Sequence, residues 1–223
     1  MKTSCTIKSF TANLALAVAL AMLAGCVSQS YEKGATTSKA LQTSADAVGA
    51  TSQSLYDVLG TLDKLTFKST GDLRDQFDAF KAASQGLDKS MGKLGESVAA
   101  LHARADAYFT DWTNHIALIQ SADLRQRSLE RQAEISSKLA DVTFNYDTLK
   151  MAIQPFMIDL KDIRVYLDTD LTVGGIATIK NTVAKTKVDA VPLRDAIKQL
   201  QTSFSSLSAT LSPVMPAAAP AAK

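Results

Sequence analysis

The sequence predicts an all-α fold, an elongated antiparallel bundle or coiled coil of four long helices. Apolar residues recur at alternating spacings of three and four over most of the chain, which keeps one face of each helix toward a partner. Glycine and proline are sparse, at 10 and 5 of 223 residues. Of the two cysteines, one lies in a segment expected to be removed and the other is expected to be modified. Helix packing rather than a disulfide framework must therefore stabilise the fold.

Residues 1–25 are predicted to be a lipoprotein signal peptide. The segment begins with Lys2 and Lys8 and no acid, and the 15 residues that follow Ser9 are apolar except for Thr11 and Asn13. A basic start, a short apolar run and small residues at its end are typical of a cleaved export signal. The run is shorter than the ~20 apolar residues that a membrane-spanning helix needs.

The order Leu23-Ala24-Gly25-Cys26 resembles the bacterial lipobox, in which a diacylglycerol is attached to the cysteine sulfur and the chain is cut before that cysteine. Acyl chains contribute roughly 0.8 kcal/mol per buried methylene, so two or three of them anchor a protein stably. Val27 follows the cysteine, a pattern that resembles outer-membrane rather than inner-membrane lipoproteins. We therefore expect lipidation at Cys26, with residues 26–35 as anchor and polar tether. The protein would then lie in the cell envelope, held at the outer membrane and facing the periplasm. The alternatives are an ordinary cleaved signal or an uncleaved anchor.

The first helix of the bundle is predicted over about residues 36–66. Its apolar seam repeats at seven-residue spacing and consists of Leu41, Val48, Leu55 and Leu62, joined by Ala45, Val58, Leu59 and Leu65. The small polar residues Ser44, Thr51 and Ser52 at partner positions predict thin packing in its first half. Thr70 or Asp72 is the candidate N-cap of the next helix, since both side chains can accept a bond from the first turn.

The second helix carries the longest seam. It reads Leu73, Phe77, Phe80, Ser84, Leu87, Met91, Leu94, Val98, Leu101, Ala105, Tyr108, Trp112, His115 and Ile119. Gly86, Gly92 and Gly95 fall inside this helix, and each costs about 1 kcal/mol relative to alanine. We expect the helix to be locally less stable at these glycines but not to be broken.

The third helix is predicted to begin near Ser121 and Asp123, an N-cap residue followed by an acid in the first turn. Its seam is Ile135, Leu139, Val142, Tyr146, Leu149, Ile153, Phe156, Leu160, Ile163 and Leu167. Residues 168–175 are predicted to form the next turn.

The fourth helix is predicted to follow that turn at once. Its seam is Ile176, Ile179, Val183, Thr186, Ala190, Leu193, Ile197, Leu200, Phe204, Leu207 and Leu211. The helical bundle thus covers residues 36–212, and residues 213–223 are a Pro/Ala-rich tail expected to be disordered. Pro155 and Pro192 lie inside the third and fourth helices at matching heights, where we predict matched bends.

The third helix also has a second apolar column opposite its seam. The column repeats every seven residues and consists of Phe144, Met151, Ile158 and Val165. Two interpretations are open. Another helix of this chain covers the column if the third helix is the central element, which we favour. Otherwise the column is an exposed surface for a helical protein partner or for self-association.

No pattern of catalytic, metal-binding or cofactor-binding residues is present. The 24 basic and 22 acidic residues become 22 against 22 once Lys2 and Lys8 are removed, which argues against nucleic acid as a partner. His115 lies four residues after Asp111 but lacks a third ligand, so a core or bundle-end position is expected. Asp159 and Asp162 are interpreted as a solvated helix face. We expect no cofactor, no metal and no enzymatic activity.

Several segments resemble an uncharacterised bacterial family, domain of unknown function 2959. The residues that carry the resemblance are Pro155, Leu160, Asp162, Tyr166, Leu167, Leu171, Ile176 and Ile179, together with Thr70-Gly71-Asp72-Leu73, Asp111-Trp112, and Leu124-Arg125 with Ser128. The turn at residues 168–172 departs from the basic turn of that family, and about one heptad is missing between Tyr146 and Pro155. The resemblance spans roughly residues 40–205 and implies a helical envelope protein with no assigned activity.

These observations favour a non-enzymatic, membrane-anchored envelope lipoprotein that acts as a helical scaffold or protein-interaction rod. The alternative is a periplasmic module that binds a lipid or an apolar ligand between softly packed helices.

Overall fold

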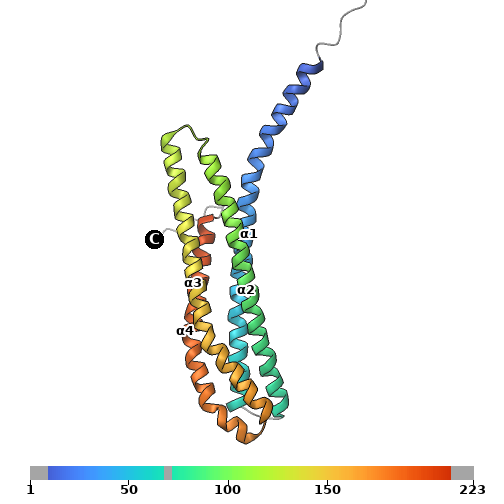
Figure 1. Cartoon of the computed structure of the whole chain (residues 1–223), viewed down its shortest axis with the longest axis vertical. Helices are drawn as coiled ribbons and strands as arrows, with labels where there is room; N and C mark the ends of the chain where they lie inside the picture. The colour runs from blue at the N-terminus through green and yellow to red at the C-terminus, as the bar shows by residue number, and fades with distance from the viewer. Residues whose placement is uncertain (1–9, 68–71, 212–223) are drawn as a thin grey trace, which may run out of the picture.

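Four long helices make up the part of the chain that the structure describes (Figure 1). The computed structural model describes residues 10–67 and 72–211, with side chains from residue 32 onward. The helices are α1 (Phe10–Phe67), α2 (Leu73–Ile116), α3 (Ala122–Thr169) and α4 (Val173–Leu211), and these residues form no strand. The predicted all-α class and the number of helices are therefore confirmed.

The helices form two antiparallel hairpins that pack side by side (Figure 1). α1 packs on α2, α3 packs on α4, and the two hairpins meet mainly where α1 contacts α4. α2 and α3 make the fewest contacts of the pairs that touch. α1 and α4 are thus the inner helices of the bundle, and α2 and α3 lie at its edges.

The core follows the predicted seams closely. Leu41, Val48, Leu55 and Leu62 of α1 are fully buried, and so are most seam residues of the other three helices. Ser44 and Thr51 are also fully buried, and their hydroxyls bond to main-chain carbonyls of Ala40, Ser97 and Ala47. These small side chains are therefore core positions whose polar groups are satisfied, as buried hydroxyls must be.

The largest departure from the predicted boundaries concerns α1, which begins at Phe10 rather than near residue 36. The expected tether, residues 26–35, is helical, and no proline interrupts it. Lys33 forms an ion pair with Asp111 of α2 at 2.7 Å. The hairpin of α1 and α2 therefore extends beyond the first seam leucine. Residues 1–9 and the tail at 213–223 lie outside the described residues, so those two predictions stay untested.

The predicted caps and turns are confirmed in part. The Asp72 carboxylate accepts a bond from the Arg74 amide at 2.8 Å and caps α2, whereas Thr70 lies outside the described residues. The Ser121 hydroxyl caps α3 through the Leu124 amide. The turn predicted at residues 168–175 is shorter, because α4 already begins at Val173.

The seam of α2 also ends differently from the prediction. Ile116 is buried at the last turn of α2, whereas His115 is exposed and Ile119 lies beyond the helix end. The periodicity cannot apply past Ile116 because the chain leaves the helix there.

Pro155 and Pro192 lie inside continuous helices. Ile153 and Phe156 flank Pro155, Leu193 follows Pro192, and all three apolar residues are buried. Figure 1 shows α3 changing direction in its second half while α4 runs beside it. α3 and α4 stay in contact on both sides of the prolines, through Asn145 with Ser203 and Asp159 with Lys185. That the bends lie at Pro155 and Pro192 themselves stays a prediction.

The three glycines of α2 should respond differently to replacement by alanine. A Cβ at Gly86 or Gly92 would meet no atom within 4 Å, so we expect each alanine to stabilise the protein by about 1 kcal/mol. A Cβ at Gly95 would lie 2.8 Å from the Tyr146 hydroxyl oxygen. Gly95→Ala should therefore show no gain or a loss in urea unfolding, and adding Tyr146→Phe should restore the gain. Equal stabilisation by all three alanines would contradict this interpretation.

Candidate functional site: an exposed apolar column on α3

The second apolar column of α3 is open to solvent along its whole length. Phe144, Met151, Ile158 and Val165 are 71%, 67%, 58% and 55% exposed, respectively. The favoured expectation, that another helix of this chain covers the column, is therefore wrong. The physical reason is the order of the helices: α3 lies at the edge of the bundle, and no other described helix covers the face opposite its seam.

The two faces of α3 differ although both are apolar. Phe156, on the seam, is completely buried, whereas Phe144, on the column, is largely exposed. A column of this kind is unusual on a soluble surface, where apolar residues are normally scattered singly.

A groove of about 330 Å³ lies beside Ile158 of the column, between α2 and α3. Ser84, Gln85 and Asp88 of α2 line one wall, and Met157 and Ile158 are among the residues of the other wall. The groove lies between the two helices that make the fewest contacts of the pairs that touch. Polar residues of α2 therefore border the column at Ile158.

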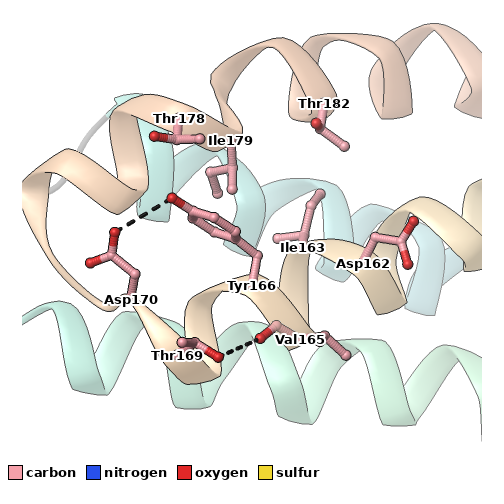
Figure 2. Close-up of a pocket in the computed structure, with 9 residues that line it drawn as sticks. All are labelled: Asp162, Ile163, Val165, Tyr166, Thr169, Asp170, Thr178, Ile179 and Thr182. Atoms are coloured by element: carbon pink, nitrogen blue, oxygen red, sulfur yellow. Dashed lines mark hydrogen bonds between the residues drawn. The ribbon is translucent and has the colours of Figure 1, made fainter.

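A second groove, of about 570 Å³, borders the lower end of the column between α3 and α4 (Figure 2). Val165 and Asp162 of the column face line it together with Tyr166. The Tyr166 hydroxyl points toward Asp170 and donates to its carboxylate at 3.4 Å, with Thr178 of α4 nearby (Figure 2). The groove combines an apolar floor with threonine hydroxyls and carboxylates. Asp162, Tyr166 and the groove residue Ile179 also belong to the stretch that resembles the uncharacterised family.

A polar cluster holds α3 against α4 above this groove. Asp159 of α3 is only 8% exposed. Its carboxylate accepts bonds from the Lys185 ammonium at 2.8 Å and from the Thr186 hydroxyl at 3.3 Å. Lys185 also reaches Asp189 at 2.8 Å. The bonds to the two carboxylates, Asp159 first, raise the pKa of Lys185 above its ordinary value.

The solvated face expected for Asp159 is thus wrong, while Asp162 is exposed as predicted. The spacing of these two acids on one helix could not separate their roles, because Asp159 lies on the side of α3 that meets α4. The sequence signal that could have indicated a buried Asp159 is the pair Lys185-Thr186, a basic and a hydroxyl residue on the facing helix α4.

The remaining candidate residues are not brought together. Cys26 lies within α1, and its side chain is outside the described residues. His115 lies at the exposed end of α2, where its Nδ1 is 2.8 Å from the Asp111 carbonyl oxygen. Among the side chains that the structure describes, no three histidine, cysteine or acidic residues are placed to hold a metal ion. In the described part of the chain no helix has the length and apolarity needed to cross a membrane.

The family described as Protein of unknown function (DUF2959) matches residues 28–212. No curated protein matches the chain.

Proposed function

Because the chain belongs to the DUF2959 family, whose function is unknown, we propose a role from its own surfaces: a lipid-anchored helical scaffold of the cell envelope whose α3 binds an amphipathic helix of another envelope protein. One observation carries this proposal. The four apolar residues of the column are more than half exposed, although they repeat with coiled-coil spacing.

The dimensions of the column suit a helix as its ligand. Phe144 and Val165 are separated by 21 residues, which corresponds to about 32 Å at 1.5 Å per residue. A seven-residue repeat keeps contact with a second helix over that length. A partner helix with apolar residues at the same spacing would cover all four side chains, the mode by which amphipathic helices are recognised on apolar surfaces.

The charge on the column favours a different protein over a second copy. Asp162 lies between Ile158 and Val165 on the same face and is exposed. Two copies anchored in one membrane would pair in parallel, which sets Asp162 against its equivalent, and opposed like charges are destabilising. Antiparallel copies would place their anchors at opposite ends of the pair. We therefore propose a partner helix with a lysine or arginine opposite Asp162.

The anchor in this proposal is the acylated Cys26, supported by the lipobox-like sequence before it. The surface presented to the periplasm is then a rigid rod, supported by the continuous seams of all four helices. The alternative, a module for apolar ligands, has less support, because seam residues such as Leu94 and Val98, beside the α2 glycines, are buried. A scaffold also requires no catalytic residues, which agrees with the expected lack of enzymatic activity.

Photo-crosslinking in living cells tests the column. A photoreactive residue at Thr148, between Phe144 and Met151, should form a product with another envelope protein, and one at Val188 of α4, which is also exposed, should not. Met151→Glu with Ile158→Glu should abolish the product, since two carboxylates would be buried at the interface. The melting temperature should not change, because both side chains are exposed.

A charge exchange then identifies the partner helix. Asp162→Lys should weaken the product, and an acid at the basic partner residue should restore it. A product containing two copies of this chain would contradict the choice of partner. A product that survives the Met151/Ile158 double variant would remove the column from the proposal.

A further inference from the structure

The end of the bundle formed by the α2–α3 turn carries exposed leucines that the column does not include. We infer that this tip, residues 117–124, rests on the surface of the same phospholipid membrane that holds the acyl chains of Cys26. The inference rests on the proposed anchor, and it adds a second contact with the membrane that fixes how the rod stands.

The structure places Cys26 and the tip at the same height along the bundle. Lys33 of α1 pairs with Asp111 of α2 at 2.7 Å, and a Cβ at Gly34 would lie 3.8 Å from the Tyr108 ring. These two contacts fix the register of α1 on α2. Cys26 lies seven residues beyond Lys33 in α1, which is about 10 Å at 1.5 Å per residue.

On the neighbouring helix, α2 continues from Asp111 for five residues to Ile116 before the turn begins. That distance is about 8 Å by the same rise. Figure 1 shows the N-terminal part of α1 and the α2–α3 turn at the same end of the bundle. An acyl group on Cys26 that enters a membrane therefore brings the tip close to its surface.

The chemistry of the tip suits a neutral lipid surface. Leu118 is 72% exposed and Leu124 is 59% exposed, and no acidic or basic residue lies between Trp112 and Asp123 apart from His115. Apolar side chains at the level of the headgroups gain by leaving water.

The charges that border the tip are engaged within the protein. The Arg125 guanidinium donates to the Ile119 carbonyl oxygen, and Arg127 pairs with Asp123 at 3.0 Å. Residues 104–131 contain four arginines and four acids, so this end of the bundle has no excess charge to attract anionic lipid. We therefore infer contact with zwitterionic phospholipid through the two leucines.

A fluorescent label at a single cysteine tests the contact. The chain after residue 25 has Cys26 as its sole cysteine, which acylation blocks, so Leu118→Cys gives one thiol for an environment-sensitive dye. Val173→Cys, at the α3–α4 turn and 81% exposed, is the matched control at the other end of the bundle. Both variants are made as acylated chains in phosphatidylcholine vesicles.

We expect the dye at residue 118 to shift to the blue and to lose quenching by iodide when vesicles are present, whereas the dye at residue 173 should not change. A dye at Leu124→Cys should be shielded in the same way, and Leu118→Asp should reduce that shielding. Shielding at residue 118 without vesicles would indicate a protein contact and overturn the inference.

The anchor is measured separately, by mass spectrometry of Cys26 and by flotation with the vesicles. Flotation of an acylated chain whose dye at residue 118 stays as exposed as that at residue 173 overturns the tip contact and leaves the proposed anchor standing. A chain that carries no acyl group at Cys26 overturns both. Cys26→Ser should abolish flotation and the shielding together.

Discussion

Replacing Phe156 by alanine should lower the free energy of unfolding by about 4 kcal/mol, the cost of removing a fully buried aromatic side chain. Phe156 is fully buried on the seam of α3 against α4. Phe144→Ala should change the free energy of unfolding by less than about 0.5 kcal/mol, as surface substitutions normally do, because Phe144 is largely exposed. Urea unfolding followed by the helical circular dichroism signal measures both.

The two variants, Phe156→Ala and Phe144→Ala, compare the two faces of one helix, because the same chemical change is made 12 residues apart in α3. Refolding on dilution of urea and an unchanged slope of the unfolding curve show that both variants unfold in the same transition. A cost of several kcal/mol for Phe144→Ala would mean that the column is covered in the isolated protein, either by this chain or by a second copy. Measurement at two protein concentrations separates these cases, since only self-association makes stability depend on concentration.

Heptad spacing was sufficient to predict which side of each helix is buried. Leu87, Leu149 and Leu200 occupy predicted seam positions on three different helices, and all are fully buried. Their spacing is a local property of the sequence, and burial of such a face is the main source of helix stability in proteins.

The order of the helices around the bundle was not predictable in this way. The column of α3 was expected to be covered on the interpretation that α3 is the central helix, but α1 and α4 take the inner positions. Their selection depends on contacts between distant segments, for example the ion pair between Lys187 and Asp63. A periodic pattern on one helix does not contain that information, so the most distinctive residues of the site were identified while their exposure was mispredicted.

The start of the fourth helix was mispredicted, because the turn predicted at residues 168–175 includes two glycines that belong to the helix. Gly174 and Gly175 lie in the first turn of α4, and the Thr172 hydroxyl accepts a bond from the Gly175 amide at 3.1 Å. Thr172 thus caps the helix, because its side chain satisfies an amide that has no partner within the helix. The two glycines are next to each other in sequence but differ in their surroundings.

Gly175→Ala should destabilise the protein by about 3 kcal/mol, at the upper end of the usual cost of overpacking. A Cβ there would lie 2.1 Å from the main-chain carbonyl oxygen of Asp170. That oxygen belongs to the tight turn, so the backbone itself must move. Gly174→Ala is the control, because its Cβ would lie 3.5 Å from the Thr172 hydroxyl oxygen, an ordinary contact. It should be neutral or stabilising by up to about 1 kcal/mol.

The main-chain origin of the clash gives this prediction a second test. If the Asp170 side chain were responsible, Asp170→Ala would relieve the cost of Gly175→Ala; because the carbonyl oxygen remains, most of the cost should persist in the double variant. A displaced Asp170 would also lengthen its 3.4 Å bond to the Tyr166 hydroxyl, so the tyrosine resonances at the groove should shift in Gly175→Ala and not in Gly174→Ala. Equal stabilities for the two alanine variants would show that the turn between α3 and α4 accommodates a side chain at residue 175, contrary to the geometry of its backbone.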